Sequence, residues 1–326
     1  MAEAGEGTGG VATAPRADVT TLMAFGGLVV IGGANAVAVR FSNLELPPFW
    51  GAAARFALAA VIFWAILLFR RVALPRGRSL TGSILYGVLS VGASYALLYW
   101  GLLKVQATVA VVLLSLGPLV TMLLAVAHRL EPFRLRGLLG SLLAVVGIVV
   151  GIGIQFGESV PVPSLLALVA GVVCIAEGSV VYKLFPSATP LPANVVAVTT
   201  GAGILVLISL VAGESWFLPS EAATVTAFGY LVVIGTVGLF YLYLVVLSRW
   251  TASATSYAFL LFPLATVVIA ALFTDERVTW GFVAGAAIAL AGVWIGAFSG
   301  TAGERARGKH VTTAAESCEP PSPGCA

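Results

Sequence analysis

Two ionisable side chains lie inside long apolar stretches of this sequence. Glu177 lies in the middle of the stretch 164–184, and Arg55 lies nearer the start of the stretch 48–69. An ionised carboxylate in hydrocarbon costs several kcal/mol unless it faces a partner or a water-filled cavity. Because a low dielectric favours the protonated form of a carboxyl group, a proton and a cationic or zwitterionic substrate can compete for Glu177. The alternative is a protonated or hydrogen-bonded glutamate that only joins two helices.

Arg55 and Asn35 each allow a binding interpretation and a structural one. Arg55 can neutralise an anionic group of a substrate or pair with a carboxylate, but its long side chain can equally extend to the nearer headgroups. Asn35 lies in the second half of the stretch 20–39, where its amide can hydrogen-bond a ligand or join two helices. We predict both residues as substrate contacts and leave the structural alternatives open.

Tyrosines and prolines inside the apolar stretches are further candidates. Tyr95, Tyr241 and Tyr257 carry a polar tip on an aromatic ring and can line a pocket, whereas tyrosines near the ends of spans more often anchor the membrane interface. Pro118 and Pro263 each remove a backbone hydrogen bond, which bends a helix and leaves a carbonyl free. We expect these two prolines to form kinks that line a cavity, the alternative being kinks that only shape packing.

Motifs for nucleotide and metal chemistry are absent from the sequence. No glycine-rich loop ending in Gly-Lys-Ser or Gly-Lys-Thr occurs, so ATP is not indicated as the energy source. The sequence has two histidines, His128 at the end of a stretch and His310 in the C-terminal tail, and they cannot assemble a zinc site. A serine hydrolase is disfavoured, because neither histidine is expected to be buried. We therefore expect no enzymatic activity, no metal and no organic cofactor, and proton coupling stays open as the source of energy.

The composition indicates where these residues lie. Apolar residues make up 60% of the 326 and charged residues only 10%, whereas soluble domains contain about a quarter charged residues. A membrane helix needs about 20 apolar residues, and the strands of a porin-like barrel would alternate in polarity, which this sequence does not do. The sequence therefore predicts an all-α polytopic membrane protein. We expect ten transmembrane helices at about 20–39, 48–69, 80–101, 105–127, 135–154, 164–184, 191–212, 225–247, 252–273 and 279–299.

The distribution of positive charge predicts the orientation of the chain. With a cytoplasmic N-terminus, thirteen of the 17 lysines and arginines fall on the cytoplasmic side. The positive-inside rule therefore predicts that both termini are cytoplasmic and that the protein lies in the cytoplasmic membrane. Because the basic residues lie between spans and not on one face, nucleic acid is not an expected partner. The expected partners are the lipid bilayer and a small-molecule substrate, and the protein can act as a monomer or as a homodimer.

Part of the chain is repeated. The segment 104–151 aligns without a gap onto 249–296, at an offset of 145 residues. The most informative matches are Pro118/Pro263, Glu131/Glu276, Gly147/Gly292 and Gly151/Gly296. The ten predicted spans divide into two units of five, and because five is odd, the second unit enters the membrane from the opposite side, as in the inverted repeats of secondary transporters. The Gly-x-x-x-Gly pairs predict close helix packing.

The repeat predicts the domain organisation. A first five-helix unit covers 19–154 and a second covers 164–299, with a loop at 155–163 between them. The tails at 1–18 and 300–326 are polar or rich in glycine and proline, so we expect them to be disordered.

The motif Lys104-x-x-Ala107…Leu116-x-Pro118…Glu131…Gly147-x-x-x-Gly151, its second copy and the first-helix ending Gly33-Ala34-Asn35 resemble the EamA family of the drug/metabolite transporter superfamily. The resemblance covers roughly residues 20 to 299. It implies two inverted five-helix repeats around a central cavity, and secondary active export of a small metabolite or drug-like compound. Glu177 departs from the family pattern, in which the sixth helix looks aromatic and apolar at this place.

Two other classes of function remain open from the sequence. A facilitator or exchanger would let a solute equilibrate without accumulating it. A receptor, scaffold or lipid-modifying membrane protein would move no solute, but such a function gives no reason for an inverted duplication.

Overall fold

The structure is a computed structural model that describes residues 18–104, 110, 113–152, 161–186, 189–273 and 280–298. All regular elements in these ranges are helices, and none of the described residues forms a strand. The predicted tails apart from Asp18, most of the predicted loop between the repeats, and Glu276 lie outside the described residues.

The helices follow the apolar stretches of the sequence, and η marks a π-helix. In chain order they are α1 (Val19–Ser42), α2 (Pro48–Arg70), α3 (Arg78–Gly87), η1 (Val88–Ala93), α4 (Ser94–Leu102), α6 (Gly117–Ala127), α7 (Leu135–Ile152), α8 (Val162–Leu184), α9 (Pro190–Val211), α10 (Ala222–Val232), η2 (Val233–Gly238), α11 (Leu239–Arg249), α12 (Ala252–Phe273), α13 (Trp280–Val293) and η3 (Trp294–Phe298). Among the described residues, seven helices are long and apolar enough to cross a membrane, and they include the continuous α3–η1–α4 and α10–η2–α11. Three shorter apolar helices in the described ranges, Gly117–Ala127, Leu135–Gly151 and Trp280–Gly296, lie within the other three predicted spans.

Two of the π-helices occupy equivalent places in the chain. Val233 and Gly238, the ends of η2, lie 145 residues after Val88 and Ala93, the ends of η1. This offset equals that of the repeated sequence. Each π-helix interrupts a long helix near its middle, and such interruptions are frequent at functional sites.

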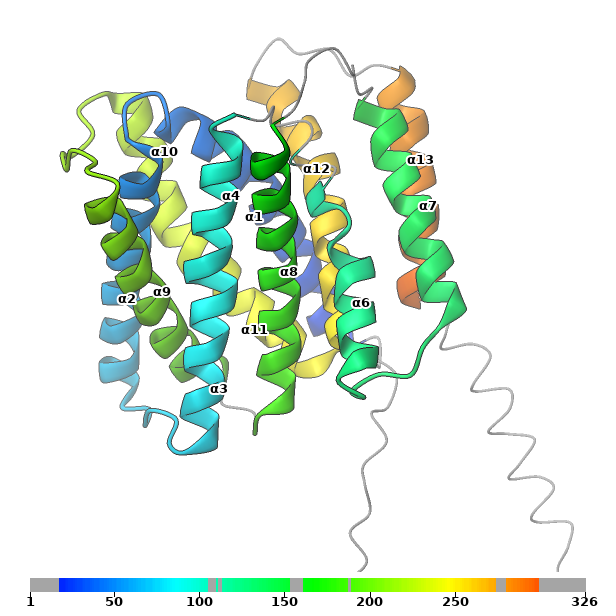
Figure 1. The fold of residues 1–326 in the computed structure, drawn as a ribbon, viewed down its shortest axis with the longest axis horizontal. Helices are drawn as coiled ribbons and strands as arrows, with labels where there is room; N and C mark the ends of the chain where they lie inside the picture. The colour runs from blue at the N-terminus through cyan, green and yellow to red at the C-terminus, as the bar shows by residue number, and fades with distance from the viewer. Residues whose placement is uncertain are drawn as a thin grey trace, which may run out of the picture.

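The packing joins helices from the two parts of the chain. Helix α2 lies along α9, and α7 lies along α13 at one edge of the bundle (Figure 1). Helix α1 packs against α10, α11 and α12, while α8 packs against α3, η1, α4 and α6. The two largest clusters of buried side chains therefore combine residues from both parts of the chain.

The α7–α13 contact depends on glycine. A side chain at Gly147 would collide with the backbone of Gly285 and Ala289, and one at Gly292 would collide with the backbone of Gly140 and Ala144. The close helix packing predicted for Gly147 and Gly292 is therefore confirmed. Neither collision can be relieved by moving a flexible side chain, because the opposing atoms belong to the backbone.

The two repeated prolines occupy different positions in their helices. Pro263 lies inside α12, as the sequence predicts. Pro118 does not lie in a helix interior: the chain turns at Ser115 and Leu116, and α6 begins at Gly117 with Pro118 in its first turn. Proline fits this place because a first-turn residue needs no backbone N–H, so the predicted kink at Pro118 becomes a helix start.

Candidate functional site

Arg55 and Tyr95 lie together in the interior. Arg55 projects from α2 and is only 2% exposed, and its Nη2 donates a hydrogen bond to the Tyr95 hydroxyl at 3.2 Å. Nε of Arg55 is buried, and the described residues provide it with no hydrogen-bond acceptor. The structure thus brings two of the predicted site residues into contact. Arg55 is inside the bundle and does not extend to the headgroups.

Aromatic rings surround this guanidinium. Its Cζ lies 4.7 Å from the centroid of the Phe56 ring and 5.2 Å from that of the Tyr95 ring, which are cation–π distances. Phe56 also makes edge contacts with the rings of Tyr95, at 4.7 Å, and Phe240, at 5.6 Å. Phe240 belongs to α11, so this aromatic cluster packs α2, α4 and α11 against one another.

Asn35 joins α1 to η2. Its Nδ2 donates a hydrogen bond to the carbonyl of Gly235 at 2.8 Å, and a side chain at Gly235 would collide with the Asn35 amide. Its Oδ1 is buried and has no hydrogen-bond donor among the described residues. Asn35 therefore holds two helices together through one end of its amide and keeps the other end free.

Glu177 has a partner that the sequence did not indicate. Its Oε1 lies 2.9 Å from Nε2 of His128, the residue that follows α6. The two side chains are 24% and 37% exposed, while Oε2 of Glu177 is buried without a hydrogen-bond partner among the described residues. Because His128 ends α6 and Glu177 lies on α8, this contact connects the two parts of the chain.

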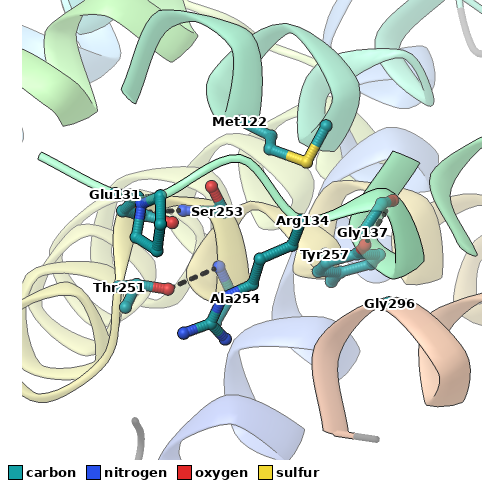
Figure 2. A pocket seen from close by; sticks show the side chains of 10 residues that line it. Met122, Glu131, Arg134, Gly137, Thr251, Ser253, Ala254, Tyr257 and Gly296 are labelled. Carbon is teal, nitrogen blue, oxygen red and sulfur yellow. Dashed lines mark hydrogen bonds between the residues drawn. The ribbon is translucent and has the colours of Figure 1, made fainter. Parts of the chain in front are cut away.

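A small pocket lies between α6, α7, α12 and η3 (Figure 2). Its lining residues are Met122, Glu131, Pro132, Arg134, Gly137, Thr251, Ser253, Ala254, Tyr257 and Gly296. Tyr257, a predicted site residue, is buried here: its hydroxyl lies 3.1 Å from that of Ser141 and donates to the carbonyl of Gly137 at 3.3 Å. These contacts on α7 give Tyr257 a packing role in the present conformation.

Glu131, at the edge of this pocket, caps a helix. Its Oε1 accepts a hydrogen bond from the Ser253 amide at the start of α12, at 3.2 Å (Figure 2). A carboxylate at a helix N-terminus satisfies free amides and the helix dipole. The described residues show no ion pair between Glu131 and Arg134, so the interaction that the structure gives the Glu131 carboxylate is this cap of α12.

Tyr241 does not join any of these sites. Its side chain is 44% exposed, whereas Tyr243, two residues further on, is buried and lies 2.7 Å from the hydroxyl of Ser179. Asn194 is another buried polar residue that the sequence did not single out: Nδ2 donates to the Phe240 carbonyl at 3.1 Å, and Oδ1 has no described partner. The sequence signal that could have identified Asn194 is its polar side chain inside the apolar stretch 191–212.

The polar groups described above can take part in hydrogen bonding and charge pairing. The described residues contain no group of three or more His, Cys, Asp or Glu side chains that could hold a metal. What they do contain is one buried guanidinium, one imidazole–carboxylate pair and two amides with a free carbonyl oxygen.

A family model described as the EamA-like transporter family matches the chain twice, over residues 20–152 and 162–297. An "uncharacterized transporter" of Archaeoglobus fulgidus is 25% identical over 271 residues, 82% of this chain and 95% of the relative. A "probable amino-acid metabolite efflux pump" of Salmonella typhimurium is 25% identical over 282 residues, 83% of this chain and 92% of the relative. An "uncharacterized inner membrane transporter" of Escherichia coli is 26% identical over 241 residues, 71% and 76% of the two chains.

A solved crystal structure has the same arrangement of helices. It superposes with a TM-score of 0.72 and covers 85% of this chain and 96% of its own, at 18% sequence identity. At this identity the similarity concerns the fold alone.

Proposed function

Because this polytopic membrane protein belongs to the EamA-like transporter family, we propose that it is a secondary transporter that exports a small metabolite or drug-like compound across the cytoplasmic membrane. Transport is the activity named for its relatives. The compound, the direction of transport and the energy source belong to the proposal.

The observation that carries the proposal is the pair of π-helices at the repeat offset. Together with the repeated sequence it supports ten transmembrane helices in two inverted five-helix units, 19–154 and 164–299, with both termini cytoplasmic. The exchange of packing partners agrees with this symmetry, since α1 packs against α12 and α8 against α6. Two inverted units that meet at a shared centre can exchange conformations, which alternating access requires.

Proton exchange is the proposed energy source, and the His128–Glu177 contact supports it. The contact ties the end of α6, in the first unit, to α8, in the second. A proton gained or lost by this pair would change the charge across the contact. A proton can in this way change the contact between the two units.

The test compares small molecules in the medium and inside cells that express the wild type, Glu177→Gln, His128→Gln or no protein. The matched control is Glu221→Gln, because Glu221 is an exposed glutamate in the loop before α10. We expect export by the wild type and the control, and a loss of about tenfold or more in the two pair variants, which corresponds to about 1.4 kcal/mol. The amino-acid metabolites named for the Salmonella relative are the first compounds to measure.

Three kinds of result would change the proposal. Full export after collapse of the proton gradient, or full activity of Glu177→Gln, would remove proton coupling and keep the transporter. Equilibration of a solute without accumulation would establish the alternative, a facilitator or exchanger. No flux of any compound, including toxic ones in a survival assay, would overturn transport itself and favour a receptor or scaffold.

A further inference from the structure

Arg55 carries a buried positive charge, which is energetically costly. The guanidinium is always charged and is buried inside a helix bundle, yet no carboxylate among the described residues pairs with it. A buried charge without a counter-charge is expensive in a protein core and more so within a membrane. The cation–π contacts with Phe56 and Tyr95 offset part of this cost, but they satisfy no N–H group.

The free donors next to Arg55 point to a missing acceptor. Nη2 donates to the Tyr95 hydroxyl, and Nε, on an edge of the same guanidinium, has no acceptor among the described residues. Because the Tyr95 oxygen accepts from Arg55, its own proton is left to donate elsewhere, and the hydrogen bonds of the described residues give it no acceptor. Arg55 Nε and the Tyr95 hydroxyl are therefore two donors beside one positive charge. A ligand group that has oxygen acceptors and a negative charge would satisfy both donors and the charge.

The shape and charge of the site select a carboxylate. A planar guanidinium edge matches the two oxygens of a carboxylate, and the single negative charge balances the single positive charge. A doubly charged phosphate would bring a second negative charge into the same apolar surroundings, where the described residues supply no second cation. The rings of Phe56, Tyr99 and Phe240 provide an apolar wall for the remainder of the ligand.

We propose that Arg55 and Tyr95 form the subsite that binds the carboxylate of the transported compound, so that the substrates are small carboxylates of the amino-acid kind. This inference rests on the proposed transport function and names its substrate class. The subsite lies where α2 and α4 meet α11 of the other unit, so a bound carboxylate contacts both units. Binding there would replace the missing counter-charge, and release would restore the unpaired guanidinium.

The experiment uses the full-length protein in liposomes and matched series of compounds. Each series holds an amino acid, its amide without the negative charge, and the amine without the carboxylate; sugars and unrelated amines complete the panel. Transport and ligand-induced thermal stabilisation are measured for the wild type, Arg55→Met, Arg55→Lys and Tyr95→Phe. Arg76→Met is the matched control, since Arg76 is exposed in the loop before α3.

We expect the wild type to prefer the acid over its amide by about ten- to a hundredfold, the effect of about 1.5–3 kcal/mol for hydrogen bonds to a charged group. Arg55→Met should lose this preference, Arg55→Lys should keep part of it, and Tyr95→Phe should reduce it by a smaller factor. The control should behave as the wild type. Tyr95→Phe keeps the test valid if the arginine variants do not fold, because it removes only one hydroxyl.

The outcomes separate the two proposals. If the wild type transports amides and amines as well as acids, the carboxylate subsite is wrong and transport stands. If folded Arg55→Met or Tyr95→Phe keeps the full preference for acids, the subsite is likewise overturned. If the wild type moves nothing in the panel, transport fails; stabilisation by acids of the wild type but not of the variants would then support the subsite as a binding site, and its absence would reject the subsite.

Discussion

The π-helices η1 and η2 have the same place in their units, but they contact their neighbours with opposite polarity. In η1 the polar group is on the π-helix: the Ser90 hydroxyl packs against Gly178 of α8 and donates to the Ile175 carbonyl at 3.5 Å. In η2 the glycine is on the π-helix, because Gly235 accepts a hydrogen bond from Asn35 of α1 at 2.8 Å. The backbone shape is shared, whereas the side-chain chemistry has diverged.

This difference separates what the scaffold requires from what a ligand requires. Both contacts pair one small residue with one polar residue, which allows close helix approach on either side. Only the η2 contact keeps a buried acceptor without a partner among the described residues, the Oδ1 of Asn35. The positively charged Arg55 cluster likewise has Tyr95 in the first unit but Phe240, 145 residues later, in the second. The duplicated framework therefore carries an asymmetric set of polar groups.

The largest expected effect comes from filling the two glycine positions. Gly178→Val and Gly235→Val should each lower the free energy of unfolding by about 1–3 kcal/mol, because the new side chain collides with Ser90 or with Asn35. Thermal unfolding of the purified variants measures the loss. Gly229→Val in α10 is the matched control, since no atom lies within 4 Å of a side chain there. Equal stability of all three variants would contradict the predicted collisions.

Removal of the polar side chains should have a smaller and unequal effect. Asn35→Ala should lower the free energy of unfolding by about 1 kcal/mol, because a short hydrogen bond to η2 is lost. Ser90→Ala should have less effect, since its hydrogen bond to α8 is at the limit of a hydrogen-bond distance. Unfolding in denaturant compares the two directly. A larger loss of stability in Ser90→Ala than in Asn35→Ala would contradict the prediction that the Asn35 hydrogen bond is the stronger of the two.

The repeated prolines should also respond differently. Pro118→Ala should change the free energy of unfolding by less than about 0.5 kcal/mol, because Pro118 begins α6 and needs no N–H. Pro263→Ala restores a backbone donor inside α12 and should straighten it, so transport should slow while the protein stays folded. Transport rates and unfolding curves of both variants test this difference. Loss of transport in Pro118→Ala alone would reverse the assignment.

The smallest expected effect concerns acid pH at the loop after α1. The hydroxyl and amide of Ser220 donate hydrogen bonds to Glu45, and these lower the pKa of the Glu45 carboxyl group from its usual value. A carboxyl group with a lowered pKa in the folded state stabilises that state above its unfolded pKa, and this contribution is lost as the pH falls through the folded pKa. Protection of the loop from proteolysis should therefore decrease below about pH 4.5.

The control for this pH effect is Glu45→Gln. This variant should show the weaker protection at every pH, with no acid transition from this loop. An unchanged acid transition in Glu45→Gln would assign it to another group. Glu214 is a similar carboxylate in the other unit, with which Glu45 can be compared. It accepts hydrogen bonds from the Phe49 and Trp50 amides at the start of α2.

Much of the helix pattern was accessible from the sequence, because the thickness of the hydrocarbon core sets the length of an apolar stretch. The predicted stretch 164–184 corresponds to α8, Val162–Leu184, and the stretch 252–273 corresponds to α12. The faces of these helices were not accessible in the same way. In a membrane both the lipid side and the core side are apolar, so the sequence does not distinguish buried Tyr243 from exposed Tyr241.

Contacts between distant residues and local breaks were beyond the sequence pattern. The His128–Glu177 contact joins residues that only the packing of α6 against α8 brings together. Pro118 gave the same sequence pattern as Pro263, and only the turn at Ser115 shows that it starts a helix. The π-helices have no composition of their own, since they depend on how their neighbours fit. The contact of Arg55 with Tyr95 likewise depends on how the helices pack.

The shared position of η1 and η2 also keeps the two units in register. A π-helical turn accommodates one residue more than an α-helical turn, so each of the two long helices carries an extra residue at the same offset. Because both helices carry it, the residues before and after the distortion stay aligned at an offset of 145 without a gap. A residue present in only one copy, such as Tyr95, therefore changes the side-chain chemistry of its unit and leaves the shared backbone as it is.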